Sequence, residues 1–210
     1  PPESTDNTNV NIVRFGDHYV AQTEAPRRVA FDPDTLATRG EFRFTDDLTL
    51  HLSTAHTTVD PRTGETVGFG LQFGRRPQYH VYAVDPETAA RRRLGSFRAA
   101  GPGYIHDCAV TRDYVVLVET PLRIDLWRML VPWGDGLLDT LRYDDDRGTR
   151  LLVVDRRTGD LLADPVVSPF FTFHHANAYQ ADGEVVMDLV AFEDASIVDA
   201  LAFEALAANA

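Results

Sequence analysis

The amino-acid sequence predicts an all-β protein, and three observations support this prediction. First, short stretches in which apolar and polar residues alternate recur along most of the chain, as in half-buried strands. Second, turn-forming residues bound these stretches. Third, 44% of the 210 residues are hydrophobic, which is enough for a packed core, yet no apolar run reaches the roughly 18 residues of a membrane-spanning helix. A β-propeller and a large β-sandwich would both produce this pattern.

The predicted strands follow one another as far as residue 192. The first two flank a Gly16-Asp17 turn and the next two flank Asp32-Pro33-Asp34-Thr35, so each pair is expected to form a hairpin. In chain order, we expect strands at Val10–Arg14, Tyr19–Thr23, Arg28–Asp32, Glu41–Phe44, Val67–Phe73, Tyr79–Asp85, Arg91–Arg98, Tyr104–Thr111, Tyr114–Glu119, Leu151–Asp155 and Glu184–Phe192.

A turn motif that opens with aspartate recurs four times, at Asp32, Asp60, Asp85 and Asp155. The aspartate side chain caps the backbone of the turn, and proline presets φ where it follows. In three of the four cases a predicted strand ends directly at the aspartate, as expected of hairpins laid down in series. The repeats are unevenly spaced, so they support a propeller only moderately.

Two segments depart from the strand pattern. Residues 122–142 are apolar, contain two tryptophans and are expected to form a helical or loop excursion. This excursion either packs on the sheet or presents an exposed apolar patch to a membrane or a substrate. The second segment, Ser196–Ala208, is rich in alanine and leucine and is expected to be a short surface helix.

The charge of the chain excludes some partners. The formal net charge is −12, and all 20 basic residues are arginine. Such an acidic surface repels phosphate backbones, so nucleic acid is not an expected partner. It suits a protein kept soluble in concentrated salt, and we expect a halophilic source. Because there is one cysteine and no secretory leader, we expect a cytoplasmic protein. The chain begins without methionine, so we expect a segment of something longer.

The seven histidines form no compact metal motif, since neither HExxH, CxxC nor HxH occurs. The GxSxG, GxxxxGK[ST] and GxGxxG motifs are also missing, which argues against serine hydrolases, nucleotide hydrolases and dinucleotide-binding enzymes. Three widely spaced histidines, His56, His106 and His174, stand beside apolar or aromatic residues. In a radial all-β fold such residues converge on the central axis and could share a metal. The alternative is that each is an ordinary structural histidine.

Three motifs stand in register along the chain. They are Thr54-Ala55-His56 followed by Asp60-Pro61-Arg62-Thr63-Gly64-Glu65, then Ile105–Thr111 with Tyr114–Pro121, and finally Phe173-His174-His175-Ala176-Asn177-Ala178-Tyr179. From about Asn9 to the C-terminus, the sequence resembles the carotenoid cleavage oxygenase family in these motifs. The third motif and the apolar excursion after Pro121 are most similar to the branch that contains the animal carotene oxygenases and the retinal isomerohydrolase.

The resemblance implies a seven-bladed β-propeller, of which residues 1–210 are one partial domain covering about the first half. It also implies Fe(II) held by four histidines, three of which match His56, His106 and His174. His174 is chosen over His175 because many family members keep only the first histidine of the pair. Glu24 matches a family glutamate that orients a ligand imidazole, and is expected to support His106. No histidine follows His175, so the fourth ligand is missing and the isolated segment is expected to be inactive.

The implied activity is that of a dioxygenase, which uses O2 to cleave a conjugated double bond of a carotenoid or apocarotenoid to aldehyde or ketone products. Retinal is an attractive product for a salt-adapted organism. Residues 126–141 match the family's apolar entrance patch, so we expect peripheral contact with the inner face of the membrane. Aromatic residues that could line a tunnel or its entrance for the apolar polyene are Tyr104, Phe171, Phe173, Trp127 and Trp133.

Two other interpretations stay open. The chain could be a non-catalytic β-propeller fragment that has lost the metal and binds an apolar ligand or a partner. It could also be a sugar-binding or scaffolding propeller whose histidines are structural. Asp107, beside His106, is expected to make a structural hydrogen bond, and His175 is assigned to the structure as well.

Overall fold

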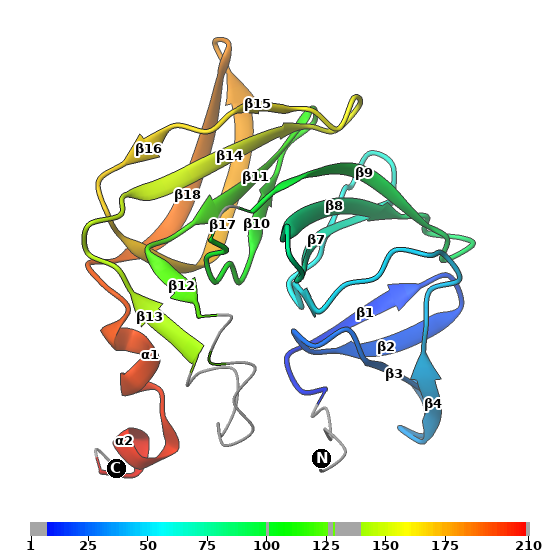
Figure 1. Cartoon of the computed structure of the whole chain (residues 1–210). Helices are drawn as coiled ribbons and strands as arrows, with labels where there is room; N and C mark the ends of the chain where they lie inside the picture. The colour runs from blue at the N-terminus through cyan, green and yellow to red at the C-terminus, as the bar shows by residue number, and fades with distance from the viewer. Residues whose placement is uncertain (1–7, 100, 126–127, 129–139, 209–210) are drawn as a thin grey trace.

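A computed structural model of the chain describes residues 8–99, 101–125, 128 and 140–208. Within these residues, 18 strands form five antiparallel sheets, and the two helices are short and close to the C-terminus. The predicted all-β class is therefore confirmed. The first two sheets lie on one side of the molecule, and the sheets that begin at residue 108 lie on the other (Figure 1). The sheets of the described residues do not form a closed propeller.

The first sheet has the order β1-β2-β3-β4, and the second has the order β5-β7-β8-β9 with β6 also paired to β7. Their strands are β1 (Asn11–Phe15), β2 (His18–Gln22), β3 (Arg28–Phe31), β4 (Thr38–Phe42), β5 (Leu52–Ser53), β6 (Thr58–Val59), β7 (Thr66–Gln72), β8 (Gln78–Val84) and β9 (Arg91–Arg98).

The third sheet has the order β10-β11-β14-β15, with β16 also paired to β14, and two further pairs are β12-β13 and β17-β18. These elements are β10 (Cys108–Val110), β11 (Tyr114–Glu119), β12 (Leu122–Ile124), β13 (Leu141–Tyr143), β14 (Thr149–Asp155), β15 (Leu161–Ala163), β16 (Val166–Val167), β17 (Phe171–Ala181), β18 (Glu184–Phe192), α1 (Ser196–Ala200) and α2 (Phe203–Ala208).

All four aspartate turns have the same geometry. In each, the aspartate carboxylate accepts the N–H of the residue two positions ahead, and the aspartate carbonyl accepts the N–H four positions ahead. The residue at that fourth position has a positive φ in every case, with Leu36 at 60°, Gly64 at 73°, Ala89 at 57° and Gly159 at 79°. Glycine adopts this left-handed conformation without the steric cost that Leu36 and Ala89 carry. The repeated motif thus fixes how one strand turns into the next.

The second sheet is covered on both faces, which explains why nearly all of β7 and β8 is buried. Tyr79, Val81 and Ala83 of β8 point into a core shared with the third sheet. Tyr82 and Val84, which alternate with them, pack against the first sheet. Successive side chains of a strand point to opposite faces, so β8 joins the two cores.

Several sequence predictions need correction. The strand expected at Glu41–Phe44 is β4, which begins three residues earlier and ends at Phe42. The strand expected at Tyr104–Thr111 is limited to β10, because Tyr104 and His106 use their side chains in a polar cluster described below. The two ends of the excursion expected at residues 122–142 are paired strands, β12 and β13. Leu122 and Ile124 are buried while the arginine between them is not, which is the period of a strand. Residues 126–127 and 129–139 of the excursion lie outside the described residues.

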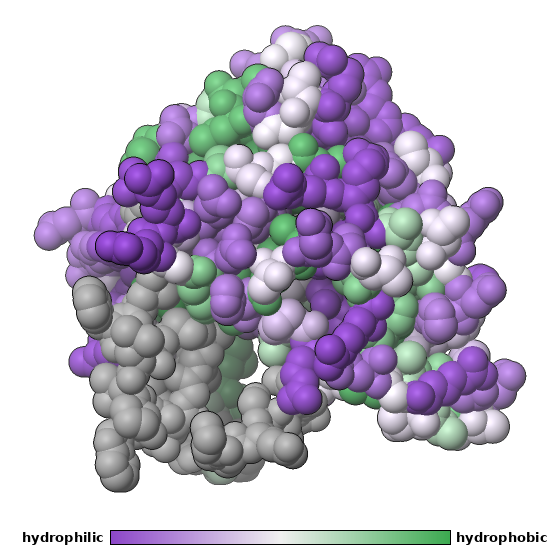
Figure 2. Space-filling view, turned by 45° about the vertical axis from the view of Figure 1, so that its right-hand side comes forward, coloured by the Kyte–Doolittle hydropathy of each residue, from purple (hydrophilic) through white to green (hydrophobic). Residues whose placement is uncertain are grey.

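The helix expected at Ser196–Ala208 is divided into α1 and α2. No described helix has the length and apolar character needed to cross a membrane. Hydrophilic side chains dominate the face of the molecule shown in Figure 2, and hydrophobic ones gather there only in smaller patches. This surface agrees with the charged composition of the chain, of which 25% is Asp, Glu, Lys or Arg.

Candidate metal centre

His56 lies in the connection between β5 and β6, where Thr54 fixes its backbone. The Thr54 hydroxyl accepts the N–H of His56 at 3.0 Å and donates to the carbonyl oxygen of His106 at 2.8 Å. His56 also forms an isolated parallel bridge with Asp107. A single threonine thus connects the backbones of the first two predicted ligands, although 50 residues separate them in the chain.

His106 lies just before β10, and Glu24 holds its imidazole. The Nδ1 atom of His106 is 2.6 Å from Oε1 of Glu24. The hydroxyl of Tyr104 donates to the same oxygen at 2.7 Å. Burial, followed by the charge of Glu24, raises the pKa of Tyr104 far above its usual range, so the phenol remains a donor. With its Nδ1 proton directed to Glu24, His106 presents the lone pair of Nε2 on the other side of the ring.

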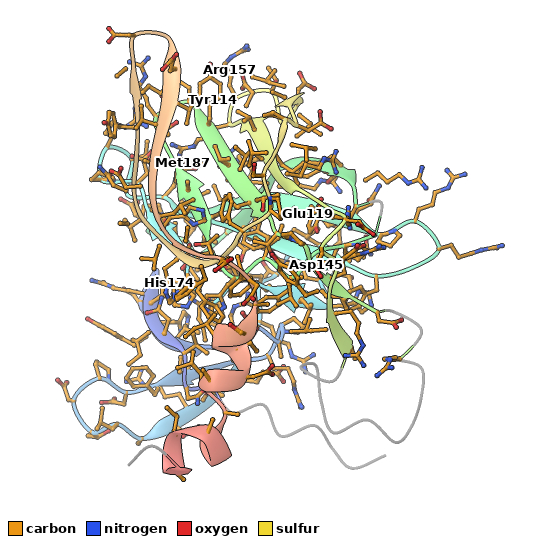
Figure 3. All side chains as sticks on the ribbon, turned by 90° about the vertical axis from the view of Figure 1, so that its left-hand side faces the viewer. Tyr114, Glu119, Asp145, Arg157, His174 and Met187 are labelled. Carbon is orange, nitrogen blue, oxygen red and sulfur yellow. The ribbon has the colours of Figure 1, made fainter. Side chains whose placement is uncertain are left out.

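His174 lies on β17, at a point where the pairing with β18 is irregular. The register shifts between Thr172 and His175 and again between His175 and Asn177. His174 is exposed, whereas His56 and His106 are half-buried. Figure 3 shows it near the middle of the molecule, on the side of β17 toward the N-terminal sheets.

The structure brings all three histidines together. Their ring centroids are 4.5 to 5.0 Å apart, and one ring nitrogen of each lies within 4.8 Å of the others. Burial, followed by the neighbouring imidazoles, lowers the pKa of His56 and of His174. Both rings are therefore neutral at pH 7, which is the form that binds a metal.

The donor set fits a transition metal such as iron. Imidazole nitrogen suits Zn, Cu, Fe and Ni. Three nitrogens bound about 2.1 Å from one metal lie about 3.0–3.6 Å apart, so ring nitrogens that lie within 4.8 Å of one another are close enough to converge on one ion by drawing together. The glutamate behind His106 is the usual partner that fixes the tautomer of a ligand imidazole.

The predicted tunnel residues occupy different positions. Phe173 packs edge-on against the ring of His106, with centroids 5.3 Å apart, and Phe171 packs edge-on against Phe173. Phe171 is fully buried and belongs to the main core. Trp127 and Trp133 lie outside the described residues.

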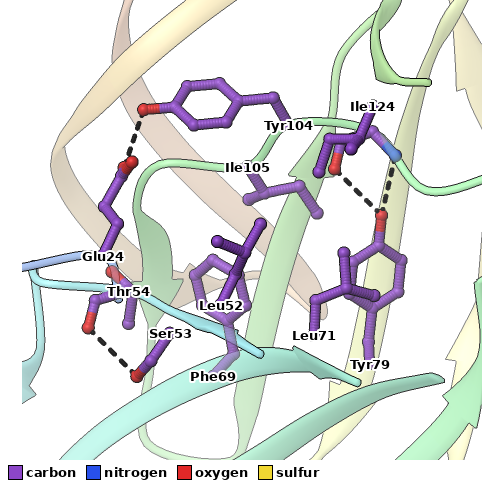
Figure 4. Close-up of a pocket in the computed structure, with 11 residues that line it drawn as sticks. Glu24, Leu52, Ser53, Thr54, Phe69, Leu71, Tyr79, Tyr104, Ile105 and Ile124 are labelled. Carbon is purple, nitrogen blue, oxygen red and sulfur yellow. Dashed lines mark hydrogen bonds between the residues drawn. The ribbon is translucent and has the colours of Figure 1, made fainter. Parts of the chain in front are cut away.

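Tyr104, the remaining predicted tunnel residue, lines a small cavity together with Glu24 and Phe69 (Figure 4). The cavity volume of about 20 Å³ is room for a single water molecule. It is far too small for a polyene. Tyr104 is thus placed to hold Glu24 in position, a role that the sequence interpretation did not assign to it.

Thr54 is also a contributor that the sequence interpretation did not identify. It stands in the first motif, but its partner is the carbonyl of a residue far along the chain, which no local pattern reveals. Asp107, in contrast, does make structural hydrogen bonds as expected, to the N–H groups of Cys108 and His175.

Comparisons with known proteins agree with this geometry. A sequence model of the family described as retinal pigment epithelial membrane protein matches residues 1–210. The carotenoid-cleaving dioxygenase of Mustela putorius furo is 33% identical, over 95% of this chain and 39% of its own length. The carotenoid isomerooxygenase of Galleria mellonella is 30% identical, over 100% of this chain and 44% of its own length.

Among solved structures, cobalt-substituted Synechocystis ACO matches with a TM-score of 0.77 at 24% identity, over 89% of this chain and 40% of that one. This match shows a shared fold. The chain spans about two-fifths of the length of the relatives named here. Since the family model matches its whole length, the chain belongs to the retinal pigment epithelial membrane protein family, that of the carotenoid cleavage oxygenases.

Proposed function

We propose that the natural-length protein is a non-haem Fe(II) dioxygenase, which cleaves a conjugated double bond of a carotenoid or apocarotenoid to aldehyde or ketone products. The observation that carries the proposal is the convergence of the His56, His106 and His174 ring nitrogens, with Glu24 behind His106. The names of the relatives, which include carotenoid-cleaving dioxygenases, support the substrate class.

The chain's own residues would perform three tasks. His56, His106 and His174 would hold the iron as neutral donors, which leaves its dipositive charge uncompensated. Glu24 would keep His106 in the tautomer that offers Nε2. Phe173, packed against His106, would give the site an apolar wall suited to a polyene. When bound, Fe(II) supplies the redox chemistry that activates O2 toward the double bond.

The finer parts of the proposal concern the rest of the protein. We propose that the serial sheets are blades of a seven-bladed propeller, because the second sheet is already covered on both faces as a blade would be. A fourth histidine would come from beyond this chain, so the 210-residue segment alone would be inactive. A cytoplasmic location, membrane contact through residues 126–141, retinal as a product and a halophilic source are proposed on sequence grounds alone.

The iron-to-protein ratio of the natural-length protein, purified without oxygen in high salt, tests the proposal. We expect a ratio near one, with carotenoid cleavage when O2 is admitted, and a ratio near zero for the 210-residue segment. The double variant His56→Ala, His106→Ala should lose both iron and activity. The matched double variant His18→Ala, His51→Ala removes two exposed histidines outside the cluster and should keep both. Iron binding that survives the first double variant would instead support a binding module with structural histidines.

A further inference from the structure

Asp107 connects the segments that carry the three clustered histidines. Its carboxylate Oδ1 accepts the N–H of Cys108 at 2.7 Å, and Oδ2 accepts the N–H of His175 at 3.0 Å. His106 directly precedes Asp107, and His174 directly precedes the residue whose N–H it binds. The backbone of Asp107 also forms the parallel bridge with His56. His56 is therefore paired with Asp107 directly, His106 is its neighbour in the chain, and His174 is the neighbour of a residue that binds it.

The contact with β17 matters because β18 does not hold this part of the strand regularly. The register of the pairing shifts on both sides of His175, so the backbone around His174 departs from the ladder. The N–H of His175 is directed to Asp107. The position of His174 relative to His106 therefore depends on this hydrogen bond, which joins residues 68 positions apart.

The imidazole of His175 lies on the same carboxylate. Its side chain is only 5% exposed, and its Nδ1 is 3.5 Å from Oδ2 of Asp107. Neither ring nitrogen has a well-formed hydrogen bond to any described residue. His175 does not belong to the cluster that could share a metal, so its ring is a buried neighbour of Asp107.

We propose that Asp107 is the positioning residue of the metal centre: by accepting the His175 N–H, it sets His174 against His56 and His106. This inference rests on the proposed function, since it concerns the same three histidines. Asp107 touches no ring nitrogen of the cluster, and its effect passes through the backbone of β17. It therefore differs in kind from Glu24, which bonds directly to a ligand ring.

Only a carboxylate can fill this position without loss. Both oxygens of Asp107 accept a backbone N–H, so each must be an acceptor. In Asp107→Asn, one of the two is replaced by an amide NH2, whichever way the amide is turned. One backbone N–H then faces another donor. The substitution keeps the size of the side chain, and it either breaks the link to β17 or turns a donor toward the N–H of the neighbouring Cys108.

Asp113 provides a matched control on the same two elements. It follows β10, and its carboxylate accepts a hydrogen bond from the side chain of Gln180 on β17 at 3.0 Å. It thus joins β10 to β17, as Asp107 does, but beyond the other end of β10. Asp113→Asn removes the same charge and leaves the contacts of the histidine cluster unchanged.

The test uses the natural-length protein with Co(II) as the probe, because its visible absorption reports the ligand geometry. We expect Asp107→Asn to weaken Co(II) binding by about 10–100-fold, as loss of a supporting hydrogen bond does, and to change the spectrum of the remaining complex. Asp113→Asn should bind within about twofold of the unchanged protein, with the same spectrum. Contacts between the three rings in the metal-free, histidine-labelled protein, measured by NMR, should be lost in Asp107→Asn alone.

The outcomes separate the two proposals. If the unchanged protein binds neither iron nor Co(II), the proposed function fails, and the ring contacts still decide the role of Asp107. If Asp107→Asn folds, keeps the ring contacts and matches Asp113→Asn in affinity and spectrum, the positioning role is overturned. Equal losses in both variants would also overturn it, because they would show a general effect on the packing of β10 against β17.

Discussion

Three segments from three different sheets run side by side, and the two ends of this group serve different purposes. Residues 54–62, 105–113 and 173–180 run side by side in the same direction, as the paired contacts His56 with Asp107, Asp107 with His175 and Asp113 with Gln180 show. We call the end with His56, His106 and His174 the inner end. The outer end consists of Asp60, Asp113 and Gln180 with the arginines that bind them.

The two ends differ in how their polar groups are satisfied. At the outer end, Asp60 accepts hydrogen bonds from Arg62 and Arg156, and Arg156 also donates to two backbone carbonyls. At the inner end, three imidazoles face one another, and burial disfavours the charged forms of His56 and His174. The outer end is satisfied by its own ion pairs and hydrogen bonds, whereas the inner end gathers three imidazoles that could hold a metal. The same segments thus combine a stabilising junction with a binding site.

The sharpest test of this difference is His174→Ala, which removes one ring from the inner end. We expect metal retention to fall more than the about 10–100-fold caused by loss of a supporting group. The free energy of unfolding of the metal-free protein should change little, because the ring of His174 is exposed. Metal content and urea unfolding measure the two effects. In the control His51→Ala, which removes an acceptor for the Phe73 N–H, metal retention should be unaffected.

The next largest effect is expected for Glu24→Gln. The amide can still contact His106 and Tyr104, but it lacks the charge that fixes the Nδ1 proton of the imidazole. Affinity for Fe(II) or Co(II) should fall by about 10–100-fold. A matched variant, Glu65→Gln, removes a half-buried carboxylate that pairs with Arg92 away from the histidines and should leave affinity unchanged. If the Glu24→Gln variant bound the metal as tightly as the unchanged protein, Glu24 would not be a residue that orients a ligand.

The sequence predicted the strands and turns away from the histidines better than it predicted the site. The strands Arg91–Arg98 and Tyr114–Glu119 have the predicted bounds. The aspartate turns could be predicted from the sequence, because the N–H groups that each aspartate side chain caps lie only two or three residues ahead of it. β17 was not predicted as a strand, since the adjacent His174 and His175 interrupt the alternation of apolar and polar residues along it.

The three histidines could be selected from sequence because each stands in a recognisable motif. Their convergence could not be derived from their spacing, since it depends on contacts between residues 50 and 68 positions apart. Glu24 was selected only through the family resemblance. Thr54 and the Glu24 contact of Tyr104 were missed, because their partners are distant in the chain and become neighbours only when the sheets pack.

At the outer end, Asp60→Asn should lower stability and leave the metal centre intact. The side chain of Asp60 is 3% exposed, and the buried donors of Arg156 would lose their charged acceptor. We expect a loss of about 1–3 kcal/mol in the free energy of unfolding, with metal affinity within about twofold. Asp85→Asn is the control, because Asp85 opens the same kind of turn without an arginine partner in the structure.

The effect of Asp60→Asn should depend on pH. Hydrogen bonds from Arg62 and then from Arg156 hold the pKa of Asp60 well below its usual range, against the opposing effect of burial. A carboxyl whose pKa is lowered by folding stabilises the protein above its unfolded pKa of about 3.9, and this contribution is lost as the pH falls. The stability difference from the unchanged protein should therefore be full at pH 7 and shrink below about pH 4. A difference that stays constant to pH 2 would show that the ion pairs contribute nothing.

The smallest effect is expected for Gln180→Leu, which cuts the outer-end link between β17 and the turn after β10. Gln180 donates to Oδ2 of Asp113 at 3.0 Å and accepts its backbone N–H at 3.2 Å. Both groups of Asp113 are near solvent and can bind water instead, so we expect a loss of about 0.5–1 kcal/mol. Gln78→Leu, at an exposed glutamine on β8, controls for the added apolar surface. Metal affinity should be the same in both, because β17 is held at its inner end by Asp107. If Gln180→Leu weakened metal binding as much as Asp107→Asn does, the two ends would be one cooperative unit, and the division between a stabilising end and a binding end would be wrong.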